Sequence, residues 1–405
     1  MIQNLEIENF IKSKLINRPE SLLKQDLVDH NKNLSKKIDK KSVLVIGGAG
    51  TIGSNYIKSI LKFKVKKLVV VDTNENGLTE LVRDLRSSND FKIPKDFVTY
   101  PIDFGSKIFY KIFKNHGPFE IISNFAAHKH VRSEKDIYSI EAMIDNNFFK
   151  AFNFLEFLTN YPPEHFFCVS TDKAANPVNI MGASKKLMEE LIFAYSNKFP
   201  IKTARFANVA FSNGSLPAGF INRLGKGQPW SCPLGIKRFF VSPEESGQIC
   251  LIASILGKSG EIFFPKLSSN EMIYFDKIAI DLLHYLGYNP YITKSEKEAK
   301  DKSIQLHTKS KNYPIYFFGS DTSGEKTFEE FYTADEEIDL NSFKNMGFVK
   351  KSIQKDIAEI KKVYFELKNL FSKENFLKDD LVKILKIYLP NFNHIETGKN
   401  LDQKM

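Results

Sequence analysis

A polar cluster follows a predicted buried strand near the middle of this 405-residue chain. The apolar stretch HFFCVS predicts the strand, and Thr171, Asp172 and Lys173 come at its end. A carboxylate beside an amine offers an acid and a base for proton transfers at neighbouring atoms of a small molecule. Met181 and Lys185 lie four residues apart at the start of a predicted helix, so they share one face of it. These five residues are the catalytic candidates.

A glycine-rich run, GGAGTIG, connects the first predicted buried strand, VLVIGG, to a helix predicted at about 52–63. The run satisfies both G-x-G-x-x-G and G-x-x-G-x-x-G. Glycines permit a tight turn and the close approach of a pyrophosphate, and the helix N-terminus supplies N–H donors. The loop therefore predicts a dinucleotide site, with cofactor contacts from Gly47, Gly50, Thr51, Ile52 and Gly53.

Two further strand ends add to this site. Asp72 ends the second predicted strand, KKLVVVD, where its carboxylate can accept both hydroxyls of an adenosine ribose. No arginine follows it directly to receive a 2′-phosphate, so the cofactor is expected to be NAD, not NADP. Asp103 and Phe104 end the third predicted strand, and we expect them to contact the adenine.

The alternation of strands and helices positions these residues. Further strands are predicted at FVTYPID, FEIISNFA and IKTARFA, with helical stretches between them. The pattern predicts an α/β protein with a Rossmann-like, doubly wound parallel sheet and a smaller C-terminal substrate-binding region. We expect a helical N-terminal extension of two short helices (1–40), an NAD-binding Rossmann domain (41–210), a substrate-binding region interleaved with the sheet (211–350) and a helical C-terminal end-piece (351–405). The Lys-, Glu- and Ser-rich stretch 294–311 predicts a solvated loop.

Composition excludes several classes of protein. No apolar run reaches the roughly 18–20 residues of a membrane helix, and the N-terminus lacks the apolar core of a secretory signal, so a cytoplasmic protein is expected. Three cysteines without metal-type spacing argue against a disulfide framework. The net charge of +10 is spread along the chain, which argues against nucleic-acid binding. His128 and His130 have no third ligand in view, so no metal is expected.

The run STDKAANPVNIMGASK (170–185), with the glycine loop and Asp72, resembles the nucleotide-sugar 4,6-dehydratases that act on UDP-N-acetylglucosamine. These are the polysaccharide-biosynthesis type within the extended short-chain dehydrogenase/reductase family. The resemblance covers roughly residues 41–350, and it includes AAHKHVRSEKD (126–136), RFANVAFSNGS (205–215), KRFFVSPEES (237–246), GEIF (260–263) and GEKTFEE (324–330). RPESLLKQD (18–26) also resembles the segment before the dehydratase domain of large, membrane-anchored members.

The resemblance implies that NAD takes hydride from sugar C4, that water leaves across C5 and C6, and that the hydride returns to C6. Lysine at position 173 points to the N-acetylhexosamine group of these enzymes. The broader family has tyrosine where Met181 stands, so Thr171 or Asp172 must take the C4 proton here, while Lys185 holds the nicotinamide ribose.

The resemblance also implies contacts to the ligands from residues outside the catalytic run. Ala126 is expected at the cofactor, and the substrate-binding candidates are Lys129, Asn208, Arg238, Glu325 and Lys326. Thr322 replaces the family's usual arginine, which puts diphosphate binding at that corner in doubt. The implied partners are a UDP-sugar substrate and further copies of the chain in a homo-oligomer, without a membrane.

Two other functions stay open. A nucleotide-sugar epimerase would need an ordinary C4 base and no C5 base, so Met181 and Lys173 both argue against it. A catalytically silent NAD-binding scaffold would not need Asp172 and Lys173, which are both intact.

Overall fold

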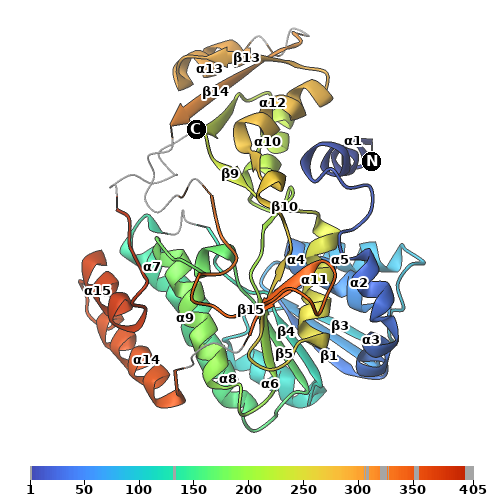
Figure 1. The fold of residues 1–405 in the computed structure, drawn as a ribbon, viewed down its shortest axis with the longest axis vertical. Coiled ribbons are helices and arrows are strands. Elements are labelled where there is room, and N and C mark those ends of the chain that lie inside the picture. Colours follow the sequence, from blue (N-terminus) through green and yellow to red (C-terminus); the bar gives the residue numbers. More distant parts are fainter. Residues whose placement is uncertain are drawn as a thin grey trace.

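The structure is a computed structural model that describes residues 2–130, 134–304, 306, 310–319, 326, 328–350 and 355–396. Within these residues the centre is a nine-stranded sheet of order β15-β16-β11-β6-β5-β4-β1-β2-β3 (Figure 1). Its strands are β1 Ser42–Ile46, β2 Lys67–Asp72, β3 Asp96–Pro101, β4 Ile121–Asn124, β5 His165–Val169, β6 Ile201–Ala204, β11 Ile262–Pro265, β15 Ile338–Asp339 and β16 Met346–Val349. All neighbours are parallel except the pairs of β16 with β11 and with β15, so the predicted α/β class with a doubly wound parallel sheet is confirmed.

The burial of each strand matches its position in the sheet. Every residue of β1 and β5 is buried, as expected for central strands of a parallel sheet that is covered on both faces. The edge strand β3 is only half-buried. The chain passes from β3 on one side of β1 to β4 on the other, which places a topological switch point at β1. Ligands of such sheets bind outside the carboxyl ends of the strands at that point.

Helices cover both faces of the sheet. They are α4 Thr51–Ile60, α5 Glu75–Arg86, α6 Lys107–His116, α7 Ile137–Ile144, α8 Lys150–Leu158, α9 Ile180–Ala194 and α11 Pro243–Leu256, and a π-helical turn, η3 Asp145–Phe149, joins α7 to α8. Helix α4 packs against α11, and α8 packs against α9. In the part of the chain that the structure describes, no helix combines the length and apolar character needed to cross a membrane.

A smaller region lies above the carboxyl edge of the sheet (Figure 1). In its described residues it contains a parallel sheet of order β13-β14-β8, two short strand pairs, three α-helices and one 3₁₀ turn. The elements are β7 Asn208–Val209 with β10 Phe240–Val241, β9 Lys237–Arg238 with β12 Ile273–Tyr274, β8 Trp230–Leu234, β13 Asn289–Thr293, β14 Asn312–Gly319, α10 Leu216–Gly225, α12 Phe275–Tyr285, α13 Glu296–Ser303 and the 3₁₀ turn η5 Ser269–Glu271. Its own core includes Phe220, which stacks on Trp230 with ring centroids 4.5 Å apart.

The prediction of a solvated loop at 294–311 is wrong for the first half of this stretch, because α13 occupies Glu296–Ser303. Ser295 caps this helix by accepting a hydrogen bond from the backbone N–H of Glu298. Ala299 is the one residue of α13 that is buried. Because α13 buries only this one residue, its sequence lacks the apolar spacing by which a packed helix is predicted, which explains the error.

The N-terminal residues connect the two regions. They form α1 Ile2–Phe10, the π-helical turn η1 Ile11–Leu15, α2 Lys24–Asp29 and α3 Asn31–Ile38, one helix more than the spacing predicts. Phe10 packs in the core of the smaller region, whereas Leu34 packs in the core of the main sheet. Arg18 forms ion pairs with Glu245 on α11 and with Glu271 on η5.

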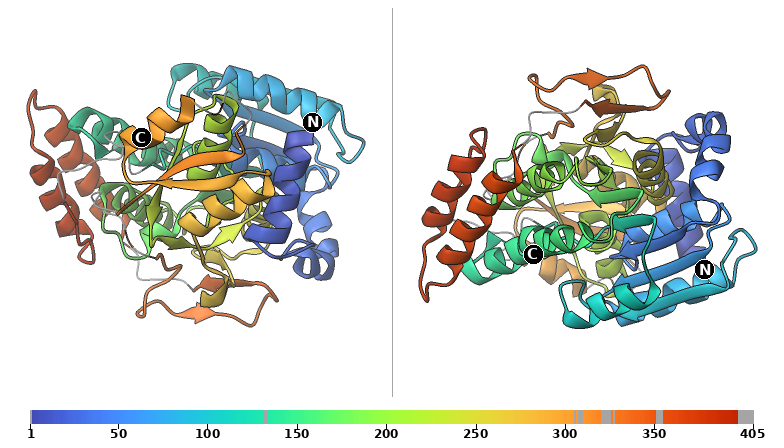
Figure 2. Two further views of the ribbon diagram at one scale, coloured as in Figure 1. Left: turned by 90° about the horizontal axis from the view of Figure 1, so that it is seen from above. Right: turned by 90° about the horizontal axis from the view of Figure 1, so that it is seen from below.

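The last two helices, α14 Ile357–Phe371 and α15 Lys378–Tyr388, lie on the side of the molecule opposite the N-terminal helices (Figure 2). Helix α14 contacts α9, and its Tyr364 ring lies 4.4 Å from the Phe152 ring of α8. The end-piece thus packs on the helix that carries Met181 and Lys185.

The contact of α11 with α4 yields a stability test. A Cβ atom at Gly247 would lie 2.2 Å from the carbonyl oxygen of Asn55, so Gly247→Ala must push the two helices apart. Such overpacking costs about 1–3 kcal/mol. Since α4 follows the glycine loop, we expect a lower Tm and weaker dinucleotide binding, measured by thermal unfolding and by titration.

Gly225→Ala on α10 is the matched control. A Cβ atom there meets nothing within 4 Å, so the change should leave Tm unchanged or raise it slightly. Equal Tm values for the two variants would contradict the close packing of α4 on α11.

Candidate functional site

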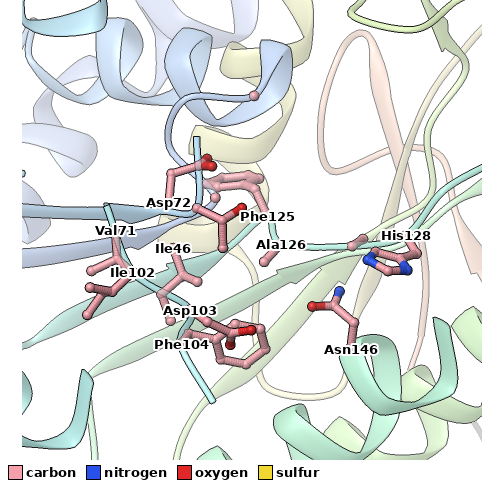
Figure 3. Close-up of a pocket in the computed structure, with 14 residues that line it drawn as sticks. Ile46, Val71, Asp72, Ile102, Asp103, Phe104, Phe125, Ala126, His128 and Asn146 are labelled. Carbon is pink, nitrogen blue, oxygen red and sulfur yellow. The ribbon is translucent and has the colours of Figure 1, made fainter. Parts of the chain in front are cut away.

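A cavity of about 230 Å³ opens at the carboxyl ends of β1, β2, β3 and β4 (Figure 3). Six of the residues predicted to bind the cofactor line it: Gly47, Gly50, Asp72, Asp103, Phe104 and Ala126. Thr51, Ile52 and Gly53 instead form the first turn of α4, and Lys185 lies on α9. The sheet's switch point and the predicted dinucleotide loop therefore coincide.

The glycine loop is folded tightly against its surroundings. Gly47 has φ +75°, a conformation that favours glycine, and a Cβ atom there would lie 2.6 Å from the backbone nitrogen of Ala126. A Cβ atom at Gly53 would lie 2.2 Å from the carbonyl oxygen of Gly47. Larger side chains at either position would push the loop out of place. Gly50 is the N-cap of α4, whose N-terminus offers donors to an anion.

Asp72 is fixed by two backbone hydrogen bonds. The N–H groups of Ala49 and Asn74 donate to its two carboxyl oxygens, each at 2.9 Å. Each oxygen keeps a further lone pair for a ribose hydroxyl. The glycine loop, the helix N-terminus and this carboxylate together fit a dinucleotide with a free 2′-hydroxyl.

Asp103 and Phe104 lie on the β3 side of the cavity (Figure 3). The ammonium of Lys150 and the N–H of Gly105 both donate to Asp103. Burial alone would raise the pKa of Asp103, but the hydrogen bonds from Lys150 and Gly105 and the charge of Lys150 together outweigh it, and the pKa is lowered. Phe104 is buried, with its ring 6.4 Å from that of Phe109. Their contact with adenine stays a prediction.

Three polar lining residues, Thr73, His128 and Asn146, are absent from the predicted cofactor set, and Figure 3 labels the last two. Asn146 lies in the π-helical turn η3, which no hydrophobic spacing predicts. The sequence drew attention to His128 only as half of a possible metal pair. Among the described residues, no three His, Cys, Asp or Glu side chains gather in a way that could hold a metal ion.

Three of the five predicted catalytic residues, Thr171, Asp172 and Lys173, meet at the end of β5. Asp172 and Lys173 begin a 3₁₀ turn, η4 Asp172–Ala174. One carboxyl oxygen of Asp172 accepts hydrogen bonds from the Thr171 hydroxyl at 2.8 Å, the Lys173 N–H at 2.9 Å and the Lys173 ammonium at 3.1 Å. The hydroxyl, the carboxylate and the amine therefore form one connected proton path.

A second carboxylate, Glu329, faces Lys173. Its oxygen lies 3.6 Å from the Lys173 Nζ and 3.7 Å from an Arg238 nitrogen, and its side chain is only 4% exposed. Burial alone would lower the pKa of Lys173, but Asp172 and Glu329 outweigh it and raise the pKa. Burial also raises the pKa of Glu329. Glu329 was not among the predicted site residues, although it belongs to the GEKTFEE run that contributes to the resemblance.

Helix α9 carries the remaining catalytic candidates. Asn179 caps it by accepting the N–H of Gly182, and the N–H of Met181 donates to Glu134 at 2.9 Å. Met181 is buried and offers no exchangeable proton. Lys185 is also buried, and its ammonium donates to the carbonyl oxygen of Val169, the last residue of β5, at 2.6 Å. Burial lowers the pKa of Lys185.

A buried ion cluster around Arg205 holds these parts together. The guanidinium, directly after β6, pairs with Glu189 of α9 at 2.8 Å and with Glu336 at 2.6 Å. Glu189 also accepts the hydroxyl of Ser170 at the end of β5. Burial alone would raise the pKa of Glu189, but the charges of Arg205 and Lys186 and the hydrogen bonds from Arg205 and Ser170 together lower it to about 2. No local sequence pattern predicts this cluster.

The sequence matches the polysaccharide biosynthesis protein family over residues 43–351. The chain belongs to this family. The capsular polysaccharide biosynthesis protein CapD of Staphylococcus aureus is 28% identical over 382 residues, which cover 92% of this chain and 58% of CapD. The chain thus spans little more than half of that relative.

Other relatives of this polysaccharide biosynthesis family member carry more specific names. The UDP-N-acetylglucosamine 4,6-dehydratase (inverting) of Campylobacter jejuni is 26% identical, over 74% of this chain and 84% of the relative. The UDP-glucose 4-epimerase of Rickettsia canadensis is 28% identical, over 68% and 86%. One solved structure of similar fold is that of the dTDP-glucose 4,6-dehydratase DesIV from Streptomyces venezuelae, a double mutant with NAD and DAU bound. Its TM-score is 0.56 at 15% identity, over 78% of this chain and 93% of that one, which supports the fold.

The residues predicted to bind the substrate are only partly brought together. Arg238 is buried beside Glu329, and Lys326 donates to the carbonyl oxygen of Asn176 at 2.7 Å, in the loop after the catalytic cluster. Asn208 begins β7, and Lys129 is exposed on the loop after β4. Glu325 lies outside the described residues, as does Thr322.

The cavity predicts that the protein prefers NAD to NADP. A 2′-phosphate would lie against the like charge of Asp72, and its binding would cost about 1–3 kcal/mol. Titration should therefore show tighter binding of NAD, and Asp72→Ala should weaken NAD binding while reducing the preference. Equal affinity of the unaltered protein for both cofactors would contradict this assignment of Asp72.

Proposed function

We propose that this chain is an NAD-dependent 4,6-dehydratase that converts UDP-N-acetylglucosamine to a UDP-4-keto-6-deoxy-N-acetylhexosamine. The observation that carries the proposal is the Lys173 ammonium between Asp172 and Glu329 at the end of β5. An elimination needs a base and an acid at adjacent carbons, and this cluster supplies both on the same edge of the sheet as the dinucleotide cavity. The family and the Campylobacter jejuni relative support the same chemistry.

NAD, when bound in the cavity, would accept hydride from sugar C4 and return it to C6. The protein's part in the first step is to remove the proton of the C4 hydroxyl. Thr171 takes this proton while it passes its own to Asp172, along the 2.8 Å hydrogen bond between them. Met181 takes no part in proton transfer. Lys185 orients the ribose of the cofactor with an N–H that the carbonyl oxygen of Val169 does not use.

The second step removes water. The new ketone at C4 acidifies the proton at C5, and the neutral amine of Lys173 takes it. The C5–C6 double bond forms as the C6–O bond breaks, and Asp172 protonates the departing oxygen with the proton that came from C4. Lys173 then returns a proton to C5 as C6 is reduced. The C4 proton and the C6 hydroxyl leave as water, and Lys173 and Asp172 are restored.

The scheme predicts the effect of removing the base. Lys173→Ala should still bind NAD and substrate but stop after C4 oxidation, because the C5 proton has no acceptor. Loss of one positioned base typically costs about 10²–10⁴ in rate. The absorbance of reduced nicotinamide should then persist in a single turnover, and NMR should show no 6-deoxy product.

Met181→Leu is the matched control for this variant. It preserves the volume of a buried thioether that carries no proton, so turnover should change little. If Lys173→Ala were active and Met181→Leu inactive, the assignment of the proton transfers to the residues at the end of β5 would be wrong.

Glu329 should set the pH dependence of the reaction. Lys173 acts as a base only when neutral, so activity should rise with pH through the pKa of Lys173. The charge of Glu329 stabilises the ammonium and raises that pKa. Glu329→Gln should therefore move the rise in kcat to lower pH, measured as a pH profile.

Glu330→Gln is the matched control, because Glu330 accepts a hydrogen bond from Asn176 and not from Lys173. Its pH profile should follow that of the unaltered protein. An unchanged profile for Glu329→Gln, or a shift to higher pH, would show that Lys173 is not the titrating base.

A nucleotide-sugar epimerase is the second candidate, supported by the Rickettsia canadensis relative. It would return a C4 epimer that keeps the C6 hydroxyl, which NMR of the product distinguishes. A cytoplasmic location and a homo-oligomer stay predictions from the sequence.

A further inference from the structure

After α15 the chain returns to the loop at 174–179, which lies between Lys173 and α9. The backbone N–H of Asn393 donates to the carbonyl oxygen of Pro177 at 3.1 Å, and that of Ile395 donates to Val178 at 2.9 Å. Residues 389–396, named here the C-terminal strap, are anchored by Phe392, which is buried in the main core. The strap lies outside residues 43–351, over which the family matches.

The strap also covers the buried carboxylate of Glu134, which binds the first turn of α9. Glu134 accepts the N–H of Met181 through one oxygen. Its other oxygen lies 4.0 Å from the Nε2 of His394, and the two side chains are 4% and 8% exposed. Among the described residues, neither of these two facing atoms has a hydrogen-bond partner. His394 therefore closes the side of Glu134 that α9 does not use.

The loop at 174–179 is the link between the two halves of the catalytic machinery. Lys173 lies before it, and Met181 and Lys185 follow it on α9. Lys326 and Glu330 bond to Asn176 from one segment, and the strap bonds to the next two residues of the loop. Catalytic groups must be held to about 0.5 Å, so a loop with partners at three consecutive residues serves that requirement.

We propose that the C-terminal strap is a positioning element of the active site. It holds the loop between Lys173 and α9, and His394 keeps Glu134 on the first turn of α9. The expected effect on turnover rests on the proposed function, whereas the effect on the loop is measured without substrate.

The test compares two shortened chains. A chain that ends at Leu389 lacks the contacts of Asn393, His394 and Ile395, and a chain that ends at Glu396 keeps them all. Hydrogen exchange should become faster at 174–185 only in the shorter chain, while exchange in the glycine loop at 47–53 stays the same. Turnover should fall by about 10- to 100-fold in kcat, because a misplacement near 1 Å costs up to that much, with NAD affinity unchanged.

Point variants separate positioning from loss of the fold. His394→Ala should accelerate exchange at 174–185 and lower kcat, and His394→Gln should restore part of both, because the longer side chain again covers the oxygen of Glu134 that His394 faces. Equal exchange and kcat in the two shortened chains would overturn the proposal, and so would a lower Tm with unchanged kcat. If the unaltered protein leaves UDP-N-acetylglucosamine intact, the proposed function fails, and the exchange data still decide the role of the strap.

Discussion

The buried guanidinium of Arg205 is the constraint on which the catalytic arrangement depends. It follows β6 and binds Glu189 of α9 on one side and Glu336 on the other. Burying these charges is costly, and removing one partner of such a cluster typically costs about 3–5 kcal/mol. The cluster therefore permits only arrangements in which all three side chains meet. Because Glu189 also binds Ser170 and Arg205 also binds the carbonyl oxygen of Phe331, the end of β5, α9 and the segment at 329–336 are fixed together.

This constraint places Glu329 against Lys173. The two carboxylates, Asp172 and Glu329, hold the Lys173 amine in place, but they also raise its pKa. A smaller fraction of the protein therefore carries the neutral amine that can act as a base. The same contacts align Thr171 and Asp172 into a proton path that does not need a tyrosine at position 181. A buried methionine at position 181 fits the proposed mechanism, in which the C4 proton leaves toward β5 and not toward α9.

Local sequence signals predicted the parts of the site that depend on neighbouring residues. The glycine loop with Asp72 and the cluster at Thr171–Lys173 each follow a strand whose apolar run is visible in the sequence. Helix α13 was not predicted, because its only buried residue is Ala299 and its sequence therefore shows no apolar residues at helical spacing. Glu329, Arg205 and His394 were not predicted for a different reason. Their partners lie up to 260 residues away along the chain, as for His394 and Glu134, and no local pattern records such a pairing.

The central claim is that the groups at the end of β5 remove and replace the C5 proton during loss of water. Conversion of UDP-N-acetylglucosamine in D₂O, followed by NMR of the product, tests it most directly. Because the ammonium of Lys173 exchanges with solvent before it returns a proton, we expect deuterium at C5 of a 4-keto-6-deoxy product. A 6-deoxy product with only protium at C5, or a product that retains its C6 hydroxyl, would contradict it.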